Sequence, residues 1–178
     1  GNKDGLSTWW YKTGLKESAG NYKDGKNDGL WQYWYENGQK EREGNYKDGN
    51  AVGLWQYWDE SGRKQSEQKY REGKREGLST WFYEEGQKKS EENCKEGKLE
   101  GLFIKWYESG QKEKEGNFKD DLWSGNWQFW YENGQKEQEA NYKEGKLDGV
   151  VIDYDKTGKE TSRKSYFQGI LKSEFKSR

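Results

Sequence analysis

The 178-residue chain has a hydrophobic fraction of only 28%, a charged fraction of 37% and a net charge of −1. This balance excludes strong electrostatic attraction of the whole chain to nucleic acid or anionic lipid. The low hydrophobic fraction is typical of disorder, but 11 Trp, 13 Tyr and 6 Phe contradict that interpretation. Because each aromatic ring can bury on the order of 150–250 Å², the chain can fold around flat rings.

One 24-residue unit occurs seven times in tandem. Two glycine series keep this spacing without insertion or deletion, one through Gly29 and Gly53, the other through Gly38 and Gly62. The copies span residues 5–28, 29–52, 53–76, 77–100, 101–124, 125–148 and 149–172. We interpret residues 1–178 as a single repeat array. Residues 1–4 match the tail of a preceding unit, so we expect the array to continue in a longer protein.

Each copy begins with an aromatic strand, LWQYWYE at 30–36 in the second copy. Asn-Gly follows at 37–38, and this dipeptide between strand-like segments is the strongest short hairpin signal. The second half, QKEREGNYK at 39–47, is a polar strand, and an Asp-Gly or Glu-Gly turn closes the unit. Two strands and two turns fill the 24 residues and leave no room for a helix.

The predicted fold is therefore all-β. Tandem hairpins are expected to form one elongated, twisted, mostly single-layer antiparallel sheet. Each hairpin is marginal by itself and depends on its neighbours for stability.

Period-two alternation sorts the first strand into two faces. Unit positions 2 and 6 share a face and are the least variable columns, so we predict that they form the structural spine. Position 2 is Leu in the first five copies. Position 6 holds Trp10, Trp34, Trp58, Phe82, Trp106, Trp130 and Tyr154. If the Asn-Gly turn is a two-residue loop, position 3 pairs with position 16, where a ring would lie over the glycine found in three copies. A three-residue loop would shift this register.

Positions 3, 5 and 7 face the other way and vary from copy to copy, as expected of a binding surface. The candidate interaction residues on this face are Trp31, Tyr33, Trp55, Tyr57, Trp127 and Phe129, with Lys40, Arg42 and Lys136 on nearby strands. Such rings can stack on bases or sugars or bind cations. The alternative is that they only seal the sheet.

Two copies depart from the pattern. The fifth contains Ile104 in its first strand and KDDLWSG at 119–125, which predicts an exposed turn at 121–124. Leu122 and Trp123 in such a turn would be a contact point for another subunit or domain. The seventh copy is aliphatic, which favours a cap on the stack and leaves a docking edge as the alternative.

The chemistry-bearing side chains favour structural roles. Paired carboxylates such as Glu41 and Glu43 are expected on a solvated face, without the pocket that acid–base catalysis needs. Cys94 takes a position that is aromatic in other copies, and the chain has no His to complete a nucleophile or a zinc site. We predict no catalytic residue, no cofactor and no metal ligand, and we interpret the Asp-Gly segments as hairpin turns rather than calcium loops.

The unit GLWQYWYENGQKEREGNYKDG at 29–49, with WYENGQK again at 130–136, resembles the bacterial MORN repeat variant, the type also found in YwqK-like antitoxins. The resemblance covers essentially the whole chain. It implies a β-hairpin repeat sheet used to bind proteins, to associate with membranes, or as part of exported surface proteins. The compartment stays open. The family motif contains no catalytic residue.

The function predicted from these observations is a non-catalytic scaffold for protein–protein interaction, either antitoxin- or immunity-like or a bacterial surface module. The alternative is a carbohydrate, cell-envelope or membrane-surface binding module that uses the aromatic face. Short Trp/Tyr/Gly repeats also occur in choline-binding proteins, but their Gly-Trp pair is missing here. The expected partner is another protein, with oligomers formed through the 121–124 turn or the open sheet edges, and no nucleic acid.

Overall fold

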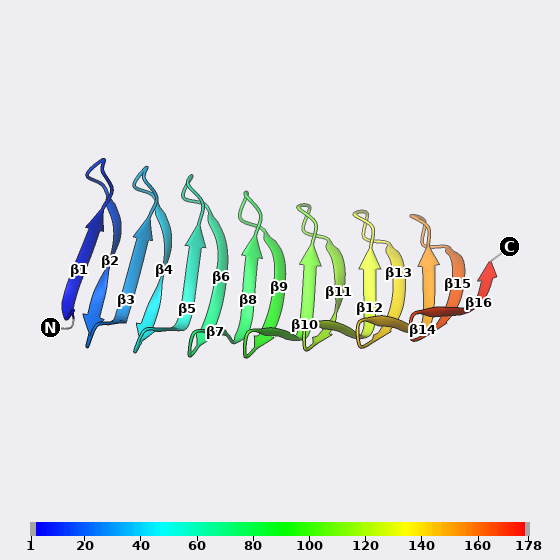
Figure 1. The fold of residues 1–178 in the computed structure, drawn as a ribbon. Helices are drawn as coiled ribbons and strands as arrows, with labels where there is room; N and C mark the ends of the chain where they lie inside the picture. The colour runs from blue at the N-terminus through cyan, green and yellow to red at the C-terminus, as the bar shows by residue number, and fades with distance from the viewer. Residues whose placement is uncertain (1–2, 177–178) are drawn as a thin grey trace. The chain divides into compact units, whose positions relative to one another are not determined.

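The structure, a computed structural model, describes residues 3–176. Within these residues every regular element is a β-strand. The sixteen strands follow one another in chain order as a single open antiparallel sheet that is not closed into a barrel, with β7 pairing to β6 beside the main path (Figure 1). The all-β hairpin-repeat class predicted from the sequence is confirmed.

The chain divides into two compact units, which are described separately. The first comprises the residues up to Gln87 together with Lys95–Gly97, and the second comprises Lys88–Cys94 and the residues from Lys98 onward. The first unit contains β1 (Gly5–Trp10), β2 (Lys16–Lys23), β3 (Lys26–Trp34), β4 (Lys40–Lys47), β5 (Asn50–Trp58), β6 (Lys64–Arg71), β7 (Lys74–Arg75) and β8 (Gly77–Phe82). The second contains β9 (Lys88–Lys95), β10 (Lys98–Trp106), β11 (Lys112–Lys119), β12 (Leu122–Trp130), β13 (Lys136–Lys143), β14 (Lys146–Tyr154), β15 (Glu160–Phe167) and β16 (Ile170–Lys176).

The Asp-Gly segments form hairpin turns, as predicted, and the structure shows that these loops have two residues. Asp24 and Gly25 have φ angles of 51° and 80°, and the flanking Lys23 and Lys26 pair directly. Positive φ at both central residues defines a type I′ turn, whose twist matches that of the paired strands. At the second such turn the Gly49 amide also donates a 2.9 Å hydrogen bond to the Asn27 carbonyl, so the turn is tied to the preceding turn segment.

The Asn-Gly connection is longer than either the two-residue or the three-residue loop considered from the sequence. Residues 35–39 separate β3 from β4, and the Tyr35 amide donates to the Gln39 carbonyl at 2.8 Å. A register shift between Tyr33 and Trp34 absorbs the extra residue as a bulge. Because of that bulge, the predicted pairing of position 3 with position 16 is still correct, and Trp31 stands opposite Gly44.

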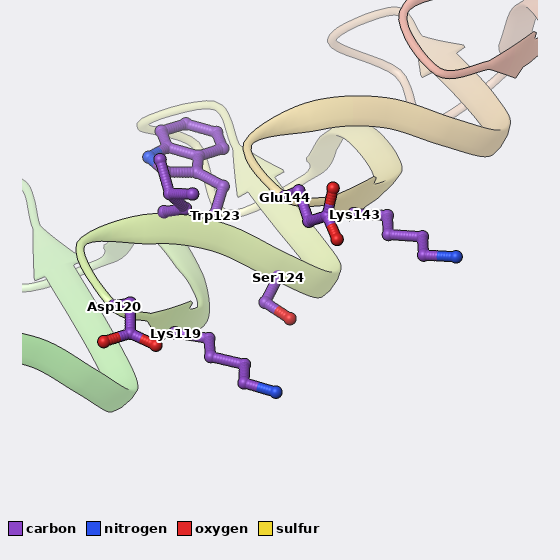
Figure 2. A pocket seen from close by; sticks show the side chains of 7 residues that line it. Lys119, Asp120, Trp123, Ser124, Lys143 and Glu144 are labelled. Carbon is purple, nitrogen blue, oxygen red and sulfur yellow. The ribbon is translucent and has the colours of Figure 1, made fainter.

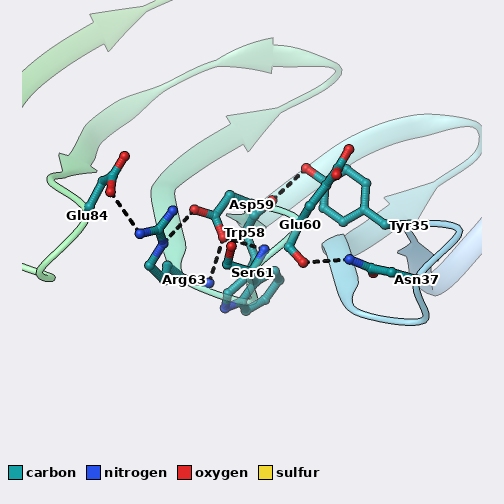
Figure 3. Close-up of polar contacts among 8 residues, drawn as sticks. All are labelled: Tyr35, Asn37, Trp58, Asp59, Glu60, Ser61, Arg63 and Glu84. Carbon is teal, nitrogen blue, oxygen red and sulfur yellow. Dashed lines mark hydrogen bonds and ion pairs between the residues drawn. The ribbon is translucent and has the colours of Figure 1, made fainter.

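Side chains at the Asn-Gly end join one hairpin to the next (Figure 3). The Tyr35 hydroxyl donates to the Trp58 carbonyl at 2.8 Å, and the Asn37 amide nitrogen donates to the Glu60 carbonyl at 2.7 Å. The tyrosine bond recurs in both units between residues 23 apart, as in Tyr107 to Trp130. Adjacent repeats are therefore linked at both ends of the strands as well as along them.

Candidate functional site

Strand register places the side chains of the first unit on two faces. Cross-strand partners share a face: Trp31 with Gly44 and Tyr33 with Arg42 lie on one side, and Leu30 with Asn45 on the other. We call the first side the aromatic face; its rings are Trp9, Tyr22, Trp31, Tyr33, Tyr46, Trp55, Tyr57, Tyr70 and Trp81. We call the other side the leucine face, after Leu6, Leu30, Leu54 and Leu78.

Burial of the two faces is the reverse of the sequence-based expectation. Trp31 and Trp55, placed on the binding face, are each only 3% exposed, whereas Leu6 is 74% exposed. The predicted spine is not a buried core: Trp10 is 56% exposed. The other spine residues are half-buried, namely Trp34, Trp58, Phe82, Trp106, Trp130 and Tyr154. The prediction was wrong because low variation among the copies at positions 2 and 6 does not report burial.

The buried tryptophans owe their burial to glycine. A Cβ built on Gly20 would lie 2.3 Å from the indole of Trp31, so the ring occupies the space above the glycine backbone. The Trp31 Nε1 donates to the Asn21 carbonyl at 3.0 Å, which satisfies its polar atom. The same arrangement occurs for Trp55 over Gly44 and for Trp127 over Gly116. The predicted ring over glycine is confirmed, but the glycine under the ring belongs to the preceding repeat.

The size of the residue at position 16 can be compared with the size of the side chain at position 3 of the following repeat. The three glycines each precede a Trp at position 3 of the following repeat. Ala140 is instead paired with Val151, and both are buried. At this pair a position-16 residue larger than Gly is packed against a side chain smaller than Trp, as expected for close packing.

Arg42 is the one cation of the first unit that lies among the tyrosines of the aromatic face in mid-strand. It pairs across the sheet with Tyr33 on one side and Tyr57 on the other, and its guanidinium carbon lies 4.3 Å from the Tyr33 ring centroid. Its Nε is buried without a hydrogen-bond partner in the described part of the chain. Burial raises the pKa of Tyr33 and of Tyr57, whose hydroxyl lies 3.3 Å from that of Tyr70. Both candidate tyrosines thus stay neutral donors beside Arg42.

From the sequence, Arg42 is predicted only to be a cation on a strand near the candidate rings. The signal for its special place was available, because position 14 is Ser in four of the other copies and Arg only here. Lys40 and Lys136, grouped with it, do not share its surroundings: Lys40 pairs with Trp34 and Lys136 with Trp130, which are position-6 residues. The structure therefore separates Arg42 from the two lysines.

In the second unit, Leu122 and Trp123 do not form an exposed turn at 121–124. The turn is Asp120–Asp121, with φ angles of 50° and 65°, and Leu122 and Trp123 begin β12. Trp123 stacks on Trp127 with ring centroids 3.8 Å apart and is half-buried, while Leu122 is 47% exposed. They lie at an open hollow of 320 Å³, also lined by Lys119, Asp120, Ser124, Lys143 and Glu144 (Figure 2).

Other candidates of the second unit fall on both sides of its sheet. Half-buried Phe129 lies 5.9 Å from Trp123 and 6.3 Å from Trp127, so these three rings form one cluster. Lys114, at the same repeat position as Arg42, lies 5.6 Å from the Trp123 centroid, and burial lowers its pKa. Ile104 pairs with Glu115 on the opposite side. The candidate residues thus do not converge on one site.

The leucine face carries a ladder of charges. The Trp58 ring is flanked by the ammonium groups of Lys40 at 5.2 Å and Lys64 at 6.0 Å. Lys64 also forms an ion pair with Glu67 at 2.6 Å, and the hydrogen bonds from Lys64 and Gln56 lower the pKa of Glu67. Carboxylates on the leucine face thus neutralise the lysines that cover the tryptophan rings. Their role is structural.

Cys94 and the acidic side chains were the other residues considered as candidates for chemistry. Cys94 is 4% exposed and fills the position that is aromatic in other copies, as predicted. Across residues 3–176 the structure brings together no group of three or more His, Cys, Asp and Glu side chains that could hold a metal ion. Over the same range there is no helix long and apolar enough to cross a membrane.

The sequence also matches a known family of repeats. A family model described as the MORN repeat variant matches residues 27–48, 75–95, 99–120 and 123–144. The first matched segment covers most of β3 and all of β4, and the last covers most of β12 and all of β13. No curated protein matches the chain.

Proposed function

We propose that this chain, which belongs to the MORN repeat variant family, is a non-catalytic scaffold that binds another protein through the aromatic face of its first unit. Repeats of this family are generally non-enzymatic and associated with binding or scaffold roles. An antitoxin- or immunity-like partner and a partner at the bacterial surface are the two forms such a scaffold would take. The identity of the bound protein separates them.

The observation that carries the proposal is the set of half-buried side chains around the buried tryptophans. Tyr33 and Tyr57 flank Arg42 on this face, Trp9 and Trp81 lie further along the same cross-strand row, and each retains accessible surface. Tyr, Trp and Arg are the residue types enriched where protein interfaces have most of their binding energy. Stacking and strand register already hold these side chains, so binding would cost little side-chain entropy.

The strand β5 offers a matched pair of variants to test the face. Ala51 pairs with Tyr46 on the aromatic face, and Leu54 is exposed on the leucine face of the same strand. Ala51→Glu and Leu54→Glu place the same carboxylate on opposite sides. Proteins captured by the intact chain from the source organism would be identified, purified and titrated against all three forms by calorimetry, after circular dichroism confirms folding.

The expected result is a purified protein that binds the wild type and Leu54→Glu equally and binds Ala51→Glu about tenfold or more weakly. Loss with Leu54→Glu and retention with Ala51→Glu would move the interface to the leucine face. Binding of isolated cell-envelope glycan or lipid, with no protein that titrates, would contradict the protein-scaffold proposal.

A further inference from the structure

We infer that the aromatic face of the first unit recognises an acidic segment of its protein partner, with a carboxylate of that segment bound at Arg42. This inference rests on the proposed function and adds the chemistry of the partner.

Among the described residues, the aromatic face of the first unit carries positively charged side chains but no negatively charged ones. Strand register assigns to it unit positions 3 and 5 of the first strand, 14, 16 and 18 of the second, and 23 after the turn. In the first unit none of these positions is Asp or Glu, although the chain has 33 acidic residues. The cations at these positions are Lys3, Arg42 and Arg75. Lys3 lies 5.1 Å from the Trp9 ring centroid, so it joins the same surface.

Two carboxylates, Glu17 and Glu41, lie near Tyr11 at the rim of the face. Glu17 and Glu41 follow the hairpin bulges and approach Tyr11, where burial and these charges raise the tyrosine pKa. Neither forms an ion pair with Arg42 in the described residues. The centre of the face is thus free of negative charge, while its edge is not.

Arg42 differs from the other cations of its neighbourhood. Lys40 pairs with Glu43 at 2.7 Å, and Arg63 pairs with Asp59 at 2.8 Å. Arg42 forms no ion pair with a carboxylate within the part of the chain that the structure describes. Its buried Nε donates a hydrogen bond to no acceptor there. A guanidinium stacked on a tyrosine keeps its planar set of donors for a carboxylate, which it binds through charge-assisted hydrogen bonds.

The spacing of the cations favours a protein segment over a polyanion. Lys3 lies over the Trp9 ring and Arg42 over the Tyr33 ring, whereas anionic lipid surfaces are recognised by clusters of Lys and Arg. Duplex nucleic acid carries a charge about every 1.7 Å and requires denser neutralisation. An acidic segment that alternates carboxylates with apolar groups matches single cations set among rings.

The second unit does not share this character. Asp153 occupies position 5 there and pairs across the sheet with Gln138, which also donates to it at 2.7 Å. Asp153 further forms an ion pair with Lys164 at 3.4 Å. The preference for an acidic ligand is therefore assigned to the first unit alone.

The test uses the full chain and a fluorescein-labelled copolymer of Glu and Tyr as the acidic aromatic probe, followed by fluorescence anisotropy. Arg42→Gln removes the central cation. Lys47→Gln makes the same charge change at the end of the same strand, where Lys47 is exposed and lies outside the aromatic face. Arg42→Lys keeps the positive charge but lacks the planar set of donors. It serves as the second variant if Arg42→Gln does not fold.

The expected result is saturable binding of the Glu–Tyr copolymer. This binding should weaken about tenfold or more in Arg42→Gln and less in Arg42→Lys, and should stay unchanged in Lys47→Gln. Equal weakening by Arg42→Gln and Lys47→Gln, or no binding by the wild type, would overturn the inference. So would preferential, Arg42-dependent binding of a Lys–Tyr copolymer, anionic phospholipid vesicles or single-stranded RNA.

Failure here is distinct from failure of the proposed function. A purified protein partner that is lost with Ala51→Glu but keeps its affinity for Arg42→Gln would leave the scaffold intact and refute the acidic preference.

Discussion

The indole of Trp55 lies over the backbone of Gly44, and a Cβ on that glycine would come within 2.2 Å of the ring. The two residues belong to successive repeats, so this contact makes the packing of one hairpin depend on the hairpin before it. It also explains how a Trp on an open sheet is only 3% exposed.

Truncation of the two tryptophans of β5 separates the buried from the half-buried face. Trp55→Ala should destabilise the chain by about 3–5 kcal/mol, because a nearly fully buried ring leaves a cavity. Trp58→Ala should cost clearly less, because Trp58 is half-buried and covered mainly by lysine side chains. Urea unfolding followed by circular dichroism measures both, and a larger loss for Trp58→Ala would contradict the observed burial.

The type I′ turns allow a stabilising substitution. Glu72 has a φ of 50° in the turn between β6 and β7, and Asn tolerates this left-handed conformation better than Glu. Glu72→Asn should raise stability by about 0.5 kcal/mol in the same unfolding assay. Glu36→Asn is the control, since exposed Glu36 lacks a positive φ and should show no such gain. Equal gains would point to the charge change instead.

Glu67 should contribute to acid sensitivity. Hydrogen bonds from Lys64 and Gln56 hold its folded-state pKa below the ordinary value of 4.5. A carboxylate with a lowered pKa contributes stability that is present above the unfolded-state pKa and lost as pH falls through the folded-state pKa. In thermal unfolding scans below pH 5, Glu67→Gln should therefore lose less stability than the wild type. Lys64→Gln should also flatten the curve, and wild-type slopes in both variants would refute the role of this pair.

Much of the fold followed from the sequence because turn chemistry is local. The two glycine series set the 24-residue unit, and Asp-Gly and Asn-Gly marked both ends of each hairpin. The position 3 to position 16 pairing was also correct, since a bulge beside Trp34 compensates for the longer loop. A bulge of this kind leaves no sequence signal when every copy has the same length.

The faces could not be predicted in the same way. Low variation at positions 2 and 6 suggested a structural spine, yet burial depends on which ring lies over a glycine in the neighbouring repeat. That contact crosses from Gly20 to Trp31, between strands of different hairpins. Trp123 was expected in a turn because the segment KDDLWSG has Asp121 where the other copies have the glycine of the type I′ turn. Without that glycine, the sequence did not mark Asp120 and Asp121 as the turn residues.

The most direct measurement of coupling between repeats is a double-mutant cycle on Gly44 and Trp55, read out as free energies of unfolding. Gly44→Ala alone should cost about 1–3 kcal/mol or more, because the new methyl group overlaps the indole. In a Trp55→Val background the same substitution should cost little, since Ala140 and Val151 show that this smaller pair fits the same position. Strong coupling between the two sites is the predicted result, and additive costs would show that successive repeats are not joined through tryptophan and glycine.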